Sequence, residues 1–474
     1  MYPQVTPASI PFKEIAQHPA VLLGMVLLGG WIGTLFPASA PLLAAVTTLY
    51  LSLIQMAALP FMILAVYFGL QRMPAVPGAG PRLVKMVLMS LLAMLLCALA
   101  GLLAAGILSA GGGMSPAQVA ALGKLTLRSE SGIVMSMYGT DDNATAPLDV
   151  EPLVPDNLFA VLAYGSVPSV LIGVLCFGTA VAVQAPGVAS PLSNIFEGIY
   201  RALESLVNRF NSLLPLAACV MAAAATATAG VEAIALLGSF LASFFGAALA
   251  VSALALGIIC RRLKQPLPTV LLALREPITV CLFSPAAVAA VPAFIQGLSV
   301  RLGFSRALVE LFMPIAPTFI KAGEAMFFAV LAIFIANLYG HPLAPGDLAL
   351  ICGLSWAAAL WSVSIVGVKS VLLGGFVLGS FGLPLEAVLP VFLLVEVLCE
   401  GARNLLSFLI SSAVIALVAD DLYINIEQIS EAWRPTTLKL AFSRKQAMLA
   451  FLLLALALFT VFCAGVGFGL HTVF

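Results

Sequence analysis

LLVEVLCEGARNLLSFLISSAVIALV, residues 393–418, is an apolar stretch long enough to cross a bilayer as a helix. It also carries a set of polar residues: Glu396, Glu400, Arg403, Asn404, Ser407 and Ser411. At about 100° per residue these positions fall within an arc of roughly 100°, while Leu, Phe, Val and Ile fill the rest of the helix. A charge inside a membrane costs about 2.5 kcal/mol or more, so such groups usually face a cavity or a partner. The stretch therefore predicts a polar seam that marks the path of a substrate or an ion.

The rest of the chain has the composition of a multi-span membrane protein. Hydrophobic residues make up 62% of it and charged residues only 9%, and the mean hydropathy is +1.13. Apolar runs of about 20 residues or more predict membrane spans. They lie near 19–39, 43–71, 83–111, 157–184, 202–228, 233–260, 308–338, 390–418 and 446–470. No soluble domain of useful size remains, and a formal net charge of zero indicates no nucleic-acid partner.

Basic residues predict the orientation of these spans. Most of the 21 Lys and Arg residues fall on one side of the membrane if the spans alternate from a cytoplasmic N-terminus. Only Lys124 and Arg128 fall on the opposite side. This asymmetry satisfies the positive-inside rule, provided that residues 265–300 and 345–385 enter and leave the membrane on the same side.

Both of those stretches contain breaks. In residues 265–300 the middle segment FSPAAVAA, residues 283–290, has Ser-Pro and small residues where a helix should continue. Residues 345–385 break in the same way around Ser362–Ser370. Broken backbone at membrane depth is tolerated only where protein or a watery cavity surrounds it, and matching breaks in two halves point to a transporter site. We expect two re-entrant helical hairpins within an inverted repeat, in an all-α polytopic membrane protein.

The order of these segments resembles the dicarboxylate/amino acid:cation symporter family, which includes the glutamate transporters. Six spans, a hairpin, a span, a second hairpin and a polar-faced span cover about residues 18–420. The local matches are VPDNLFAVLAYGSVPSVLIG (154–173), MPIAPTFIKAGEAMFFAVLAIFIANLYG (313–340), VLGSFGLPL (377–385) and the stretch quoted first. The resemblance implies a glutamate-transporter-like fold and a homotrimer that works by alternating access.

The resemblance also implies how the chain divides into a scaffold and a transport core. Residues 1–264 would mainly form a scaffold of spans one to six, with spans three and six packing on the transport core and an acidic external loop at 112–156. The transport core would be residues 265–420: hairpin 1 (265–300), span 7 (306–338), hairpin 2 (345–385) and span 8 (388–419). Residues 421–474 would be a cytoplasmic linker and an extra C-terminal span, which lie outside the family core.

Site residues follow from the family pattern D-x-G-R-[TC]-x-x-N-x-x-x-D in the last span. Here Glu400 replaces its first acid, Arg403 is kept and Asn404 follows it, while Ser407 and Ser411 replace the later Asn and Asp. By resemblance, Glu400 would face a substrate amino group and Arg403 would hold a carboxylate. The hairpin tips and the seventh span would complete the substrate site with Ala287, Val288, Val368, Lys369, Ser370 and Glu324.

Sodium ligands of the family are replaced in this chain. Where the family has NMDGT, residues 320–324 read IKAGE, and Ser411 stands at the place of an Asp that binds sodium. Because a hard cation needs several oxygen ligands, we expect sodium-independent transport, with Lys321 as a built-in cation. A carboxyl group desolvated in a cavity can take up a proton near physiological pH, so Glu324, Glu396 and Glu400 are the candidates for proton coupling.

Other readings of the same residues stay open. The charges can pair simply to hold the core together, either as Lys321–Glu324 or as Arg403–Glu324. The second pair would repel a further carboxylate and would favour a neutral or mono-anionic substrate. A non-transporting receptor or an anion-leak relative would keep the fold without alternating access.

Enzyme classes are disfavoured. Every Asp lies in a predicted loop, no His lies within a span, and HExxH and Walker motifs are missing. No cofactor, catalytic residue or resident metal is predicted. We expect a multi-pass symporter of the inner or plasma membrane with lipid around it, a small dicarboxylate or acidic amino acid as substrate, and a proton rather than sodium as the coupling cation.

Overall fold

The computed structural model is helical throughout the residues that it describes, which are 19–36, 39–76, 78–112, 157, 167–184, 186–229, 237–283, 287–362, 370–381 and 389–419. The helices before the first broken stretch are α2 (Pro19–Leu35), α3 (Ala40–Arg72), α4 (Ala79–Ile107), α8 (Val167–Ala182), α9 (Pro186–Phe210), α10 (Leu214–Ala229) and α12 (Gly238–Leu263). Then follow α13 (Leu267–Ala273), α14 (Arg275–Phe283), α15 (Val291–Gln296), α16 (Arg306–Phe319), α17 (Ala322–Leu338), α18 (Pro345–Trp361), α19 (Ser370–Gly379) and α20 (Leu389–Val418). Shorter helical turns are η2 (Met73–Ala75), η4 (Asn211–Leu213), η5 (Ala287–Ala290) and η6 (Gly297–Arg301).

Six helical segments in the described part of the chain are long and apolar enough to span a membrane. They agree with the spans predicted near 43–71, 83–111, 202–228, 233–260, 308–338 and 390–418. The helical segment that matches 202–228 begins earlier than predicted, at Pro191. The shorter apolar helices α2 and α8 lie within the first and fourth predicted spans. These helices confirm a polytopic, all-helical membrane protein. The acidic loop from 113 to 156, the linker and the extra C-terminal span lie outside the described residues.

The seventh predicted span is broken in the middle. Ile320 and Lys321 have ψ angles of 80° and 53°, so they separate α16 from α17. Pro314 and Pro317 lie inside α16 just before the break. A proline lacks the N–H that a helix interior needs and pushes against the preceding turn, so two of them weaken the helix where it ends. The break places backbone ends beside the polar face of α20.

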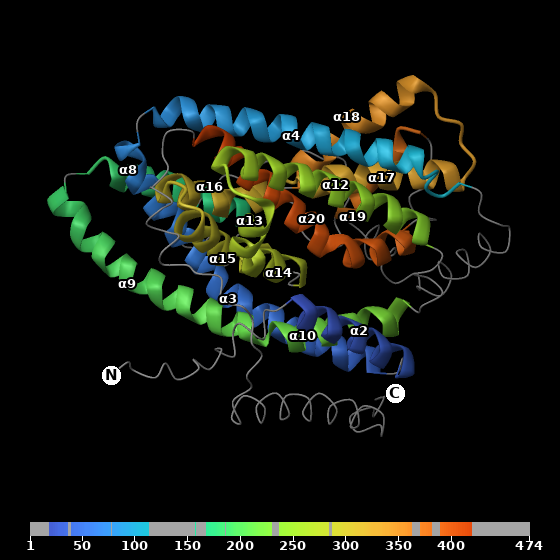
Figure 1. Cartoon of the computed structure of the whole chain (residues 1–474), viewed down its shortest axis with the longest axis horizontal. Helices are drawn as coiled ribbons and strands as arrows, with labels where there is room; N and C mark the ends of the chain where they lie inside the picture. The colour runs from blue at the N-terminus through green and yellow to red at the C-terminus, as the bar shows by residue number, and fades with distance from the viewer. Residues whose placement is uncertain are drawn as a thin grey trace, which may run out of the picture.

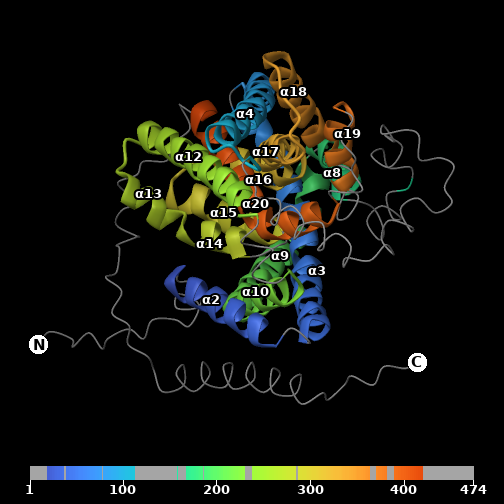
Figure 2. The same ribbon diagram turned by 90° about the vertical axis from the view of Figure 1, so that its right-hand side faces the viewer.

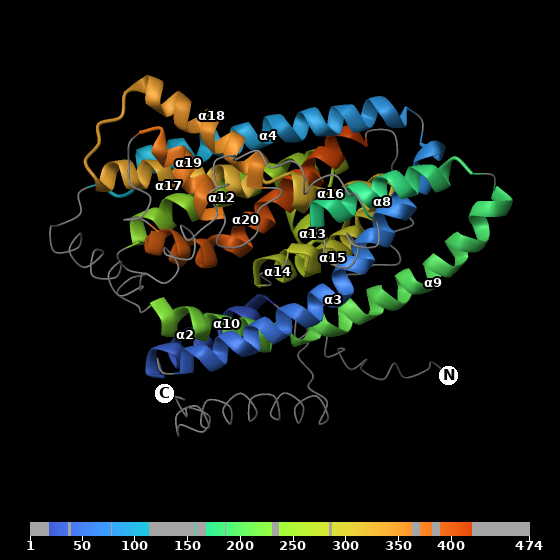
Figure 3. The same ribbon diagram turned by 180° about the vertical axis from the view of Figure 1, so that it is seen from behind.

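The helices form two groups that are visible in Figures 1 and 2. In the first group, α3 contacts α8, α9 and α10, and α2 packs on α10. In the second, α4, α12, α17 and α20 contact one another, and α18 packs on α4 and α17. The view from behind shows α8 alongside α3 (Figure 3). Helix α16 contacts both α3 and α20, so it lies where the two groups meet.

Hydrogen bonds tie α4 to the later helices. The Asn337 amide donates to the Ala110 carbonyl at 2.8 Å, and the Trp356 indole donates to the Leu91 carbonyl at 3.1 Å. Arg82 donates to the carbonyl of Val418, the last residue of α20, at 3.2 Å. The third predicted span therefore packs with elements that come more than 200 residues later in the chain.

In the first broken stretch, the helix before the break (α14) and the helix after it (α15) both pack on α20. The rings of Phe294 on α15 and Phe408 on α20 stack with centroids 4.5 Å apart. On α14, the backbone of Leu282 lies so close to Gly401 that a Cβ there would overlap it. Residues 284–286 of the first predicted break and residues 363–369, most of the second, lie outside the described residues. The re-entrant hairpins and the inverted repeat stay predictions.

Replacing Gly401 by alanine tests the close approach of α14 and α20. The added methyl group would meet the Leu282 carbonyl, and overpacking of this kind costs about 1–3 kcal/mol. We expect Gly401→Ala to lower the midpoint of thermal unfolding of the purified protein. Gly257→Ala on α12 is the control because nothing lies within 4 Å of a Cβ at that position. Equal midpoints for the two variants would contradict the packing described here.

Candidate functional site

Arg403 is the centre of the candidate site. Its side chain lies on α20 and is only 4% exposed. One terminal nitrogen, Nη1, donates to the Glu324 carboxylate at 2.7 Å, and the other, Nη2, donates to the Glu396 carbonyl oxygen at 3.1 Å. The guanidinium carbon lies 4.5 Å from the centre of the Phe327 ring, a cation–π contact. A buried guanidinium is thus held by an anion, a carbonyl and an aromatic face.

One donor of this guanidinium has no partner within the described residues. The Arg403 Nε is buried and makes no hydrogen bond there. An unpaired buried donor costs about 1–3 kcal/mol, so native proteins rarely leave one without a reason. The Glu396 carboxylate lies 3.9 Å from Nη2. Of the three guanidinium nitrogens, Nε is the one that makes no hydrogen bond among the described residues, so its N–H can donate to a ligand oxygen.

Lys321 lies at the break between α16 and α17, directly before the first residue of α17. Its ammonium group interacts electrostatically with Glu324, Glu400 and Arg403. Glu324 is in the first turn of α17, and its carboxylate accepts a hydrogen bond from Arg403 and not from Lys321. Of the two pairings left open by the sequence, the structure therefore contains Arg403–Glu324.

Helices α17 and α20 touch backbone to backbone beside Arg403. A Cβ at Gly323 would overlap the Arg403 backbone, so only glycine fits. The Gly323 N–H donates to the Ser407 hydroxyl at 3.2 Å, and that hydroxyl donates to the Arg403 carbonyl at 3.0 Å. Ser411 donates to the Ser407 carbonyl at 2.8 Å. Ser407 links the two helices, and both serine hydroxyls stay within this hydrogen-bonded chain.

The remaining predicted site residues are placed only in part. Glu400 and Asn404 are half-buried on α20. Ala287 and Val288 are half-buried in η5, which contacts α3, α14, α15 and α16. Val368 and Lys369 lie outside the described residues, and Ser370 begins α19 without a described side chain. Their part in the substrate site stays a prediction.

Sequence analysis missed Phe327 and the Gly323 amide. Phe327 lies three residues after Glu324 on the same helix, so the two side chains share a face. This spacing could have predicted that Phe327 lies beside the charged cluster. The contact of Gly323 with α20 was harder to predict, because a glycine inside an apolar span is common for many reasons.

The apolar spans packed around buried ionisable groups define a multi-pass membrane protein with a polar site among its helices. The model of the sodium:dicarboxylate symporter family matches residues 18–422, and the chain belongs to that family. This match confirms the family resemblance predicted from the order of the segments.

Curated relatives agree with the family match. The chain is 23% identical to the C4-dicarboxylate transport protein of Azorhizobium caulinodans over 375 residues, which are 77% of this chain and 81% of the relative. It is 23% identical to the protein of the same name from Bordetella avium over 407 residues, 84% of this chain and 86% of that one. C4-dicarboxylate transport protein 1 of Pseudomonas aeruginosa is 26% identical over 224 residues, 47% of this chain and 49% of the relative.

A double-mutant cycle on Arg403 and Glu324 tests whether this pair organises the site. Glu324→Gln removes the anion and leaves a buried guanidinium, which we expect to cost about 3 kcal/mol of stability. Arg403→Met together with Glu324→Gln removes both charges and should recover part of that loss. Thermal unfolding of the four proteins measures the coupling energy. Additive effects of the two substitutions would contradict the pairing.

Proposed function

We propose that the protein is a secondary transporter that carries a C4-dicarboxylate together with a cation. The family match supports this class, and the relatives named as C4-dicarboxylate transport proteins support the substrate. The observation that carries the proposal is Arg403, a buried guanidinium whose Nε makes no hydrogen bond among the described residues of this membrane protein. A planar guanidinium suits a carboxylate oxygen better than any other common ligand group.

Charge balance supports co-transport of a cation. Arg403 and Lys321 supply two positive charges beside the three carboxyl groups of Glu324, Glu396 and Glu400. Lys369, in the predicted tip of hairpin 2, would bring this cluster to neutrality. A dicarboxylate then adds negative charge that nothing in the cluster compensates, and uncompensated charge at membrane depth is costly. Cations that enter with the substrate remove this cost.

Protons fit this role better than sodium ions. Sodium is bound by several oxygen ligands, but residues 320–323 offer no side-chain oxygen, and the Ser407 and Ser411 hydroxyls are engaged between α17 and α20. Lys321 supplies a permanent cation at this point instead. Glu324, Glu396 and Glu400 supply carboxyl groups that can bind a proton.

The two helix groups suggest how the substrate crosses the membrane. We assign α2, α3, α8, α9 and α10 to a scaffold, and α4, α12 to α20 and the substrate site to a moving core. The contacts of α4 and α12 with α17 and α20 support placing the third and sixth spans with the core. By family analogy the protein would be an inner-membrane homotrimer with a cytoplasmic N-terminus, and the two hairpin tips would enclose the substrate against Glu400 and Arg403.

One contact favours a second substrate class. The Arg403–Glu324 bond of 2.7 Å already gives the guanidinium an anionic partner, and a second carboxylate there would be repelled by the first. A neutral or mono-anionic substrate would avoid this repulsion. Protonation of Glu324 would also avoid it, which is how the dicarboxylate reading accounts for the pair.

Uptake into vesicles tests the proposal directly. Purified protein in liposomes should accumulate labelled succinate under an inward proton gradient, equally well with sodium or with choline outside. Labelled glutamate, alanine and lactate in parallel separate dicarboxylate, amino-acid and mono-anionic substrates. Sodium dependence would refute proton coupling. Accumulation of alanine or lactate but not succinate would favour the second class, while no accumulation of any of them would favour a receptor or a leak.

The built-in cation is tested by Lys321→Met. Loss of the ammonium group leaves the carboxyl groups of the site with one positive charge fewer, so we expect proton-driven uptake to fall at least about tenfold or to become dependent on sodium. Lys85→Met, at an exposed position on α4, is the matched control and should keep full activity. Unchanged proton-driven uptake by Lys321→Met that stays independent of sodium would refute the role of Lys321.

A further inference from the structure

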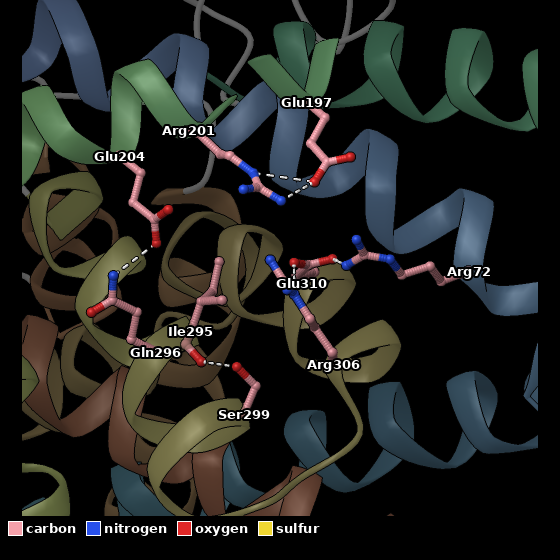
Figure 4. A network of polar contacts seen from close by, with 9 residues as sticks. All are labelled: Arg72, Glu197, Arg201, Glu204, Ile295, Gln296, Ser299, Arg306 and Glu310. Carbon is pink, nitrogen blue, oxygen red and sulfur yellow. Dashed lines mark hydrogen bonds and ion pairs between the residues drawn. The ribbon is translucent and has the colours of Figure 1, made fainter. Parts of the chain in front are cut away.

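A second polar cluster lies away from the Arg403 site, where α16 meets the first helix group. A cavity of about 480 Å³ opens there, with Arg72 on α3 and Glu204 on α9 on one side and Gln296 on α15 and Arg306 on α16 on the other (Figure 4). None of these four residues belongs to the substrate site described above. The cavity therefore lies at the boundary between the proposed scaffold and the proposed core, beside the direct contact of α3 with α16.

Glu310 of α16 is shared by two arginines beside this cavity. Its carboxylate is fully buried and bonds Arg72 across the boundary through one oxygen. Through the other oxygen it bonds Arg306, one turn earlier on its own helix, at 2.5 Å. Figure 4 shows Glu310 between the guanidinium groups of Arg72 and Arg306. The Arg72–Glu310 bond crosses between the helix groups, whereas the Arg306–Glu310 bond lies within α16, although Arg306 also interacts with Tyr200 on α9.

A second bond crosses the same boundary. Gln296 on α15 donates to the Glu204 carboxylate on α9 at 2.7 Å. The neighbouring charges pair on their own side: Arg201 with Glu197 on α9, and Arg301 with Glu276 in the first broken stretch. These internal pairs would survive a movement of one group against the other.

The sharing of Glu310 makes the crossing bond reversible. A fully buried carboxylate that lost its only partner would be an uncompensated charge, which costs several kcal/mol. Here Arg306 stays with Glu310 when Arg72 leaves. Arg72 itself is 38% exposed, so it can be hydrated once it is released. The Arg72–Glu310 bond can therefore break without leaving either charge buried and unpaired.

We propose that Arg72–Glu310 and Gln296–Glu204 form a polar latch that holds the core against the scaffold in the arrangement seen here, and that the cavity gives the two sides room to part. This inference rests on the proposed function, because it requires a core that moves. Arg72 then controls the balance between two positions of the core, while Arg306 keeps Glu310 neutralised in both.

Distance measurements between spin labels test the latch. In otherwise cysteine-free protein in lipid nanodiscs, Ile199→Cys on α9 and Val300→Cys on η6 place labels at exposed positions on the two sides. Double electron–electron resonance, with labelled protein diluted by unlabelled protein, is recorded with and without succinate. Arg72→Gln removes the crossing bond between α3 and α16. Arg201→Gln controls for charge loss on α9.

We expect two distances in the parent protein, and Arg72→Gln should shift their ratio at least about fivefold toward the distance not seen here. Gln296→Leu should shift it in the same direction. A shift by Arg201→Gln as large as that by Arg72→Gln would overturn the latch and leave the proposed function intact. A single distance in every sample, with no uptake into vesicles, would remove the moving core and the latch with it.

Discussion

The burial of one guanidinium group organises this structure. Arg403 stays charged, so an apolar bundle can hold it only if it receives an anion, an acceptor and a polarisable surface. Glu324, the Glu396 carbonyl and the Phe327 ring supply these, and two of the three come from α17. To deliver them, α17 must lie against the backbone of α20, which is possible only because residue 323 has no side chain.

The same requirement accounts for the serines on α20. With the two backbones in contact, the Gly323 amide needs an acceptor, and the Ser407 hydroxyl provides it. A larger side chain at that position would separate the helices and weaken the hold on Arg403. Ser407 thus serves helix packing, while Lys321, directly before α17, carries a covalently attached ammonium group.

Sequence patterns predicted the helices and the polar face of α20 because both depend on periodicity within one segment. The break at Ile320 was not predicted, since neither Ile nor Lys is a typical helix breaker and its cause lies in Pro314 and Pro317 upstream. The sequence also did not predict which charged side chains pair with one another. Glu324 is near Lys321 along the chain but bonds Arg403, 79 residues away. The bond from Arg72 to Glu310 spans 238 residues and depends on how separate helices pack.

The broken seventh span has an electrostatic consequence of its own. The first turn of a helix has N–H groups without partners inside the helix, and these carry the positive end of the helix dipole. Helix α17 begins directly after Lys321, so backbone and side chain both bring positive charge to this part of the chain, where Ser407 accepts from the Gly323 N–H and Glu324 lies in the first turn. Part of the attraction for anions therefore belongs to the backbone and would persist in any sequence that interrupts the helix at this residue.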